Sequence, residues 1–169
     1  MNSKFWLTYV LLVIAQAILY NYCHFTPYLI LTILPVIVLC IPTSVGTNAA
    51  LLISFATGLA VDYFAEGALG INAAALVPIA LIRRPLIGLM FGSEPFERKE
   101  NINAQKYGFT KVSLAFICVT AIFLAIYILI DCAGTRPAWF ILLTLVVSVL
   151  GSYLLSITVI NLLAYDDRR

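Results

Sequence analysis

The chain has 169 residues, of which 63% are hydrophobic and only 11% are charged, and its formal net charge at pH 7 is +2. Soluble domains are about half apolar and about a quarter charged. With a mean hydropathy of +1.04, this composition excludes an ordinary soluble domain and indicates one integral membrane domain. The basic residues form no stripe interleaved with aromatic residues, which argues against nucleic-acid binding.

Six apolar segments predict an all-α, polytopic membrane bundle. A membrane-crossing helix needs about 20 residues, and the second and fourth segments are short. At about 1.5 Å per residue, each would reach only about two-thirds of the hydrocarbon core. Both carry an internal proline, Pro35 and Pro78, which membrane helices tolerate when neighbours satisfy the freed carbonyl. The six predicted helices cover about residues 5–22, 28–41, 49–65, 68–82, 112–130 and 138–163.

The first segment imitates a secretory signal peptide, because Lys4 precedes an apolar run. Residues 21–24 (Asn-Tyr-Cys-His) offer no small-residue cleavage site. We therefore expect this segment to be retained as the first crossing.

The basic residues predict the orientation. If the N-terminus is cytoplasmic, nine Lys and Arg residues lie inside and Arg136 alone lies outside, as the positive-inside rule favours. The same arrangement requires an even number of crossings, which six satisfies. We therefore expect both termini in the cytoplasm, with residues 83–111 as a cytoplasmic loop. The nine residues are Lys4, Arg83, Arg84, Arg98, Lys99, Lys106, Lys111, Arg168 and Arg169.

A ridge of every fourth residue marks the third segment: Ala50, Ser54, Gly58, Asp62 and Glu66. Such residues share one face of a helix, and small ones let membrane helices approach closely. A carboxylate inside an apolar run is costly and indicates a functional site. Two interpretations stay open. Either the acidic end of a packing ridge faces water, or Asp62 pairs with a donor in the bundle or in a partner.

Small residues open the fourth segment, where Gly67 and Gly70 precede Ala73 and Ala74. Glycine permits a tight turn and close backbone contact. We expect a compact hairpin between the third and fourth helices, with Asp62 near its outer end.

A second every-fourth-residue ridge lies on the sixth segment: Thr144, Ser148, Ser152 and Ser156, with Gly151 alongside. Hydroxyl hydrogen bonds between membrane helices average well under about 1 kcal/mol, so close approach is the main value of such a ridge. The ridge serves either packing within the bundle or docking of another protein's helix.

Arg83 and Arg84, followed by Pro85, are expected to end the fourth helix as a cytoplasmic anchor. The apolar stretch after them, as far as Phe96, is too short to span a membrane. We expect it to lie at the inner headgroup layer.

Catalytic chemistry finds little support in this sequence. His24 is the only histidine, which excludes a histidine-pair metal site and disfavours a Ser-His-Asp triad. There is no glycine-rich phosphate loop. We expect no cofactor, no metal and no enzymatic activity. Cys23 and Cys132 fall on the expected outer side, where a disulfide is possible but two unpaired thiols are favoured.

One motif resembles a known family. Gly58-Leu59-x-x-Asp62, followed after seven residues by Gly70-x-x-Ala73, in a six-helix protein of this length resembles MreD, the rod-shape-determining membrane proteins of bacteria. The expected topology is similar over nearly the whole chain, whereas the residue-level similarity covers only about residues 58–73.

The resemblance implies a non-enzymatic scaffold of the cell-wall elongation (cell shape) machinery in the bacterial cytoplasmic, or inner, membrane. The implied partners are an MreC-like single-pass protein, an MreB-like filament, a RodA-type glycosyltransferase and a penicillin-binding transpeptidase of peptidoglycan synthesis. The fold of the family is similar to that of the substrate-binding subunits of energy-coupling-factor transporters. An alternative is therefore a vitamin-type transport subunit, whose outer pocket would use Tyr20, Tyr22, His24, Asp62 and Tyr63.

Overall fold

Every element among the described residues is a helix. The structure is a computed structural model that describes residues 3–22, 28–64, 68–92, 94–97, 107–133 and 135–166. Five helices are long and apolar enough to cross a membrane: α1, α3, α4, α7 and α8. The expected all-helical, multi-pass membrane protein is confirmed at this level. The helices are α1 (Ser3–Tyr22), α2 (Leu34–Leu39), α3 (Thr47–Phe64), α4 (Ile71–Phe91), α5 (Glu94–Glu97), α7 (Phe109–Cys132) and α8 (Ala138–Asp166).

The first, third, fifth and sixth predicted segments match α1, α3, α7 and α8 to within three residues at each end. The fourth does not end where expected, because α4 continues through Arg83 and Pro85 to Phe91 and stops at Gly92, whose φ is 78°. A proline removes only one hydrogen bond from a membrane helix, and neighbouring groups can compensate. The loop predicted at 83–111 therefore begins only after Gly92.

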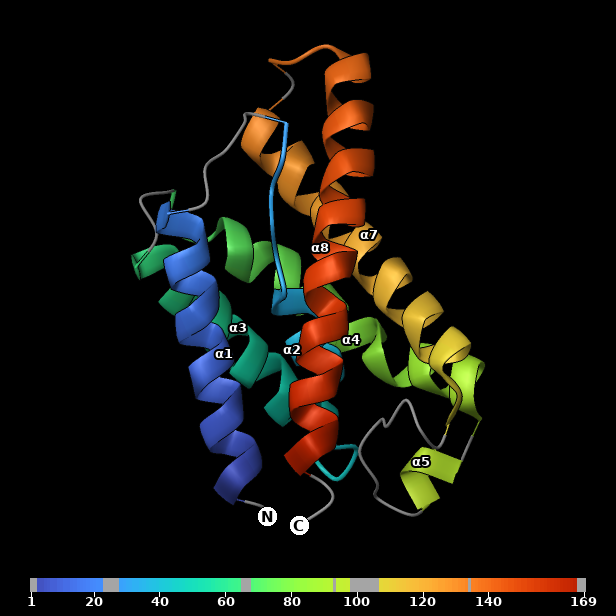
Figure 1. The fold of residues 1–169 in the computed structure, drawn as a ribbon. Helices are drawn as coiled ribbons and strands as arrows, with labels where there is room; N and C mark the ends of the chain where they lie inside the picture. The colour runs from blue at the N-terminus through green and yellow to red at the C-terminus, as the bar shows by residue number, and fades with distance from the viewer. Residues whose placement is uncertain are drawn as a thin grey trace.

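The prediction of a helix over residues 28–41 is wrong for its first half. Residues 29–33 are non-helical and run nearly straight in Figure 1, and only Leu34–Leu39 form α2. Pro35 lies in the first turn of α2, where its missing N–H is harmless. In a longer helix the same proline would lie in the interior. The β-branched side chains of Ile30 and Thr32 also favour extended backbone.

This non-helical start makes the second segment longer than a helix of the same number of residues. Extended backbone advances about 3.3 Å per residue, against about 1.5 Å in a helix. Five extended residues (28–32) and seven helical ones (33–39), placed end to end, would cover about 27 Å.

The short helix α2 is the centre of the bundle. All six of its residues are buried, and it packs against α1, α4, α7 and α8. In Figure 1, α1 and α8 flank the straight segment that leads into α2, while α7 runs obliquely to them and α4 runs mostly across the view. The first turn of α1 and the last turn of α8 lie at the same end of the bundle (Figure 1).

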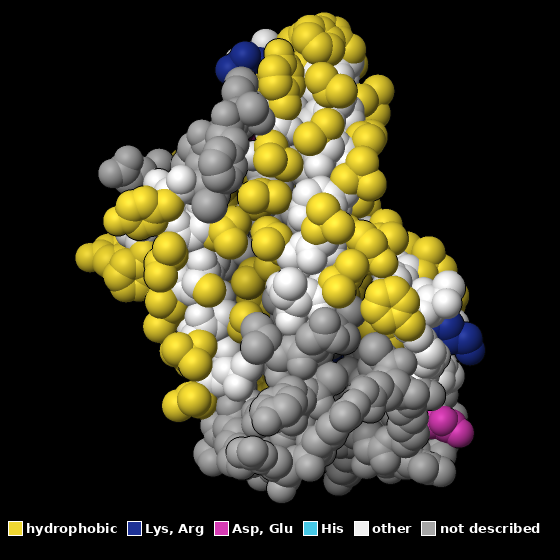
Figure 2. Space-filling view, in the orientation of Figure 1, with side chains coloured by type: hydrophobic (Ala, Val, Ile, Leu, Met, Phe, Trp, Pro, Cys, Tyr) yellow, Lys and Arg dark blue, Asp and Glu magenta, His cyan; other side chains and the backbone are white. Residues whose placement is uncertain are grey.

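The outer surface is that of a protein surrounded by lipid. Figure 2 shows hydrophobic side chains spread over the described part of one face, with the visible charged side chains at its edges. On α8, Leu142, Val146, Leu150 and Leu154 are each more than half exposed. Apolar exposure on this scale is rare in soluble monomers, so the surface agrees with a membrane location.

Candidate functional site

The carboxylate of Asp62 caps α4 from the neighbouring helix. Asp62 is only 4% exposed. Its Oδ2 accepts the backbone N–H groups of Gly70 at 2.9 Å and Ala73 at 3.4 Å. Its Oδ1 accepts the backbone N–H of Asn72 at 3.2 Å and the side-chain Nδ2 of Asn72 at 2.8 Å. The first N–H groups of a helix lack partners within the helix, and negative charge is favourable there.

This geometry decides between the two interpretations of Asp62. The carboxylate pairs with donors inside the bundle, and the interpretation in which it faces water is wrong because the neighbouring α4 covers it. Tyr20 extends the cluster, since its hydroxyl donates to Oδ1 of Asn72 at 3.3 Å. Glu66 and Gly67 lie outside the described residues.

Two glycines allow the α3–α4 hairpin to form. A Cβ on Gly58 would lie 2.4 Å from the Cα of Ala73 and 2.5 Å from its nitrogen, so the two backbones are in contact. Gly70, immediately before α4, has φ +99°, in a region that L side chains rarely adopt. Gly58, Asp62, Gly70 and Ala73 therefore form one unit, which we call the hairpin lock.

We expect Gly58→Ala to destabilise the protein by about 1 to 3 kcal/mol, because the added methyl group would push the α3 and α4 backbones apart. The matched control is Gly88→Ala within α4, where the nearest atom to an added Cβ is 4.0 Å away. That control should be neutral or stabilising by up to about 1 kcal/mol, since alanine favours helix. Thermal unfolding of both variants in lipid nanodiscs checks this, and equal melting temperatures would contradict it.

Serines of α8 hold the non-helical segment. The Oγ of Ser148 accepts the N–H of Ile30 at 2.9 Å and donates to the carbonyl of Tyr28 at 3.5 Å. The Oγ of Ser152 accepts the N–H of Thr32 at 3.0 Å and donates to the carbonyl of Ile30 at 3.3 Å. Each hydroxyl thus bridges a carbonyl and the N–H two residues later.

The two spacings match. Four residues of helix advance about 6 Å, and two residues of extended chain advance about 6.6 Å. The every-fourth-residue ridge of α8 is therefore in register with every second residue of the segment. Gly151 lies in the same contact, since a Cβ there would lie 2.9 Å from the Leu31 side chain and 3.0 Å from that of Leu29.

Gln16 of α1 holds the opposite edge of the segment. Its Nε2 donates to the carbonyl of Leu31 at 3.1 Å, and its Oε1 accepts the N–H of Ile33 at 2.7 Å. Gln16 is fully buried. Non-helical backbone at membrane depth is tolerated only where protein surrounds it and satisfies its polar groups. Gln16, Ser148 and Ser152 meet that requirement, and we call them the backbone clasp.

The rest of the α8 ridge also faces the interior. Thr144 is 2% exposed, and Ser148, Ser152 and Ser156 are fully buried. Ser156 donates to the carbonyl of Ser152 at 2.7 Å within its own helix. The ridge therefore packs within the chain, and the described arrangement leaves no surface for a foreign helix at Ser148 and Ser152.

Arg83 is not the expected surface anchor. It is 1% exposed, and its Nε donates to the carbonyl of Leu39 at 3.2 Å while a terminal nitrogen donates to the carbonyl of Ile41. The last carbonyl groups of a helix lack partners within the helix, and a cation is favourable there. Arg83 therefore caps the C-terminal end of α2. Arg84 is exposed, with its guanidinium 5.9 Å from the centre of the Phe96 ring.

Comparison of the chain with protein-family models, curated proteins and solved structures gives no match. The roles of these residues therefore rest on their geometry. In the described part of the chain, no group of three or more His, Cys, Asp or Glu could hold a metal ion. Cys132 is a buried free thiol, and Cys23 lies outside the described residues.

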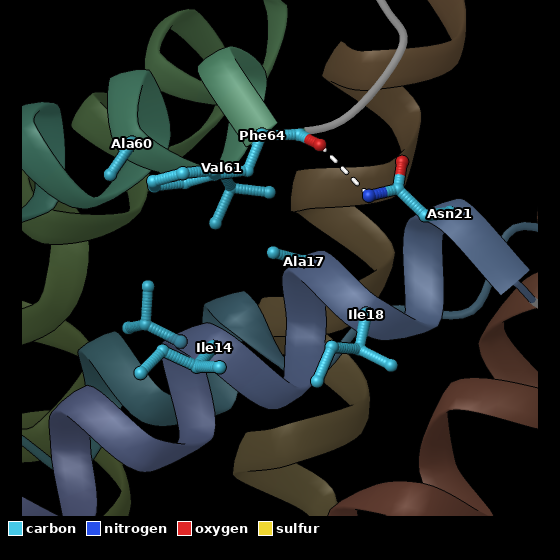
Figure 3. A pocket seen from close by; sticks show the side chains of 8 residues that line it. Ile14, Ala17, Ile18, Asn21, Ala60, Val61 and Phe64 are labelled. Atoms are coloured by element: carbon cyan, nitrogen blue, oxygen red, sulfur yellow. Dashed lines mark hydrogen bonds between the residues drawn. The ribbon is translucent and has the colours of Figure 1, made fainter.

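One groove opens between α1 and α3 (Figure 3). Its volume is about 240 Å³ and its lining is apolar apart from Asn21. The Nδ2 of Asn21 donates to the carbonyl of Phe64 at 2.8 Å, so this amide is already bonded to the backbone. The groove is therefore better suited to an apolar occupant than to a polar one.

The tyrosines expected around a vitamin pocket do not converge on one site. Tyr20 points into the bundle toward Asn72. Tyr22 is 81% exposed and Tyr63 is 75% exposed, as aromatic residues at a membrane interface often are. His24 lies outside the described residues.

Proposed function

We propose that the chain is a non-enzymatic membrane scaffold of the bacterial cell-wall elongation machinery. The observation that carries the proposal is the hairpin lock. Gly58, Asp62, Gly70 and Ala73, the residues on which the resemblance to MreD rests, make one set of contacts between α3 and α4. These contacts fix the arrangement of α3 and α4, which we propose is the arrangement shared with the MreD family.

The proposed topology has six crossings, with both termini in the cytoplasm. Five crossings are the long helices, and the sixth is the stretch of residues 28–39, whose end-to-end length of about 27 Å suits the bilayer. An even number of crossings agrees with α1 beginning and α8 ending at the same end of the bundle (Figure 1). The excess of Lys and Arg supports the cytoplasmic assignment.

A scaffold role is supported by how the polar side chains are used. Asp62 and the backbone clasp all bind backbone groups of the same chain. These bonds fix the relative positions of the helices. The exposed apolar sides of the helices are then available to membrane partners. The proposed partner is an MreC-like single-pass protein, in an assembly with an MreB-like filament, a RodA-type glycosyltransferase and a penicillin-binding transpeptidase.

The proposal is tested by expressing the tagged chain in a rod-shaped bacterium that lacks its own MreD-type protein. We expect rod shape to be restored and the MreC-like protein to co-purify in comparable amount. Round cells and no recovered partner, with full-length chain present in the inner membrane, would refute the scaffold function.

The alternative function is a vitamin-type substrate-binding subunit. The observation that favours it is the groove between α1 and α3. Mass spectrometry of protein purified in mild detergent distinguishes the two functions. A stoichiometric small molecule would favour the transport subunit, and protein free of such a molecule would favour the scaffold.

A further inference from the structure

The crossing formed by residues 28–39 is held by two helices at opposite ends of the chain. Gln16 belongs to α1, whereas Ser148 and Ser152 belong to α8, about 120 positions away from the residues they bind. In the window Ala138–Thr158 of α8, 22% of the residues are buried, the smallest share among the five candidate spans. The crossing therefore depends on a helix of which most residues in this window are not buried.

We infer that docking of α8 is the step that completes this crossing, so that residues 28–39 adopt their membrane-spanning form only after the last helix is in place. The inference rests on the proposed six-crossing topology. In this inference, α8 packs onto residues 28–39 and supplies the hydrogen bonds that they lack without it.

The backbone explains why the segment cannot settle without α8. Removing α8 would leave the carbonyl groups of Tyr28 and Ile30 and the N–H groups of Ile30 and Thr32 without their partners. In lipid, such groups have no water to bond. The alternative, a continuous helix, would place Pro35 in its interior and would remain too short to span the core.

The α3–α4 hairpin, in contrast, carries its own hydrogen bonds. The hairpin lock uses no residue of α8. Loss of the two serine contacts should therefore displace residues 28–46 while the turn between α3 and α4 stays in place. A displacement confined to residues 28–46 would show that the two serines position this segment. A general loss of stability would affect both turns.

The experiment uses the full-length chain with its four cysteines replaced by alanine and one reporter thiol added. Ser44→Cys reports the exposed turn after α2, and Leu69→Cys reports the exposed turn before α4. Each reporter is combined with Ser148→Val plus Ser152→Val, or with the matched control Ser156→Val, whose hydroxyl bonds only its own helix. Membrane vesicles of known sidedness are labelled with an impermeant maleimide.

Without serine substitutions and in the Ser156→Val control, the Ser44→Cys thiol should react from the side that holds the N-terminus. In the double variant the unfinished segment should hold its turn within the bilayer, so we expect this labelling to fall at least fivefold, while labelling at Leu69→Cys from the opposite side is unchanged. Ser148→Thr plus Ser152→Thr, which keeps both hydroxyl groups, should restore part of the signal.

Unchanged labelling at Ser44→Cys in the double variant would overturn the inference, and so would an equal loss at Leu69→Cys. The proposed topology fails separately if, without serine substitutions, the Ser44→Cys thiol reacts from the side opposite the N-terminus. The scaffold function is tested independently by recovery of the MreC-like partner.

Discussion

Replacing Asp62 with alanine is expected to destabilise the protein by about 3 to 5 kcal/mol. The substitution would leave the backbone N–H groups of Gly70, Asn72 and Ala73 without their acceptor at a buried position. Each orphaned buried donor costs about 1 to 3 kcal/mol. The sum is limited to the stated range because α4 can shift and the shorter side chain admits water to part of the site.

The measurement is the free energy of unfolding in bicelles or nanodiscs, with Asp131→Ala as the matched control. Asp131 lies near the end of α7 and is exposed, so its loss should change stability by less than about 0.5 kcal/mol. Asp62→Asn should fall between the two, because one amide oxygen can still accept while the amide nitrogen faces other donors. Equal stability of the Asp62 and Asp131 variants would refute the capping role.

The hairpin lock was predictable because its parts are close in sequence. Gly58 and Asp62 are one helical turn apart, and Gly70 and Ala73 follow across a single tight turn. Spacing of this kind predicts that the four residues lie at the contact between two adjacent helices. The sequence could not show that the donors for Asp62 are backbone N–H groups, since every residue has the same backbone and only the position of α4 brings three of those groups together.

The backbone clasp was predictable only in part. The every-fourth-residue ridge of α8 was visible, but the pattern does not reveal whether a helix or an extended chain packs on it. Gln16 gave a signal that the sequence interpretation did not use, since a lone amide in an apolar run must find buried partners. The non-helical path of residues 28–33 depends on contacts with Ser148 and Ser152, and no local propensity shows contacts of such long range.

The burial of Arg83 also could not be predicted from the sequence. The positive-inside rule counts Lys and Arg near helix ends, and it treats Arg83 and Arg84 alike. In the structure the two neighbours differ fully, because a helix turns by about 100° per residue and directs one side chain at α2 and the other outward. Which of two adjacent arginines is buried depends on where α2 ends.

Replacing Arg83 with methionine is therefore expected to cost about 2 to 4 kcal/mol, whereas Arg84→Met should change stability by less than about 0.5 kcal/mol. Two effects oppose each other at Arg83. Methionine relieves the desolvation of a buried cation, but it leaves the carbonyl groups of Leu39 and Ile41 without their donor. Hydrogen bonds that involve a charged group contribute about 1.5 to 3 kcal/mol each, so the loss of two should exceed the relief.

Arg83→Lys separates charge from geometry in the same assay. Lysine keeps the cation but lacks the planar fork that reaches two carbonyl groups at once, so it should recover less than half of the loss. The free energies of unfolding of the Arg83→Met, Arg83→Lys and Arg84→Met variants, measured in nanodiscs, give the order directly. If Arg83→Met were as stable as Arg84→Met, the end of α2 would not need its cap, and burial of α2 by its apolar neighbours alone would hold the centre of the bundle.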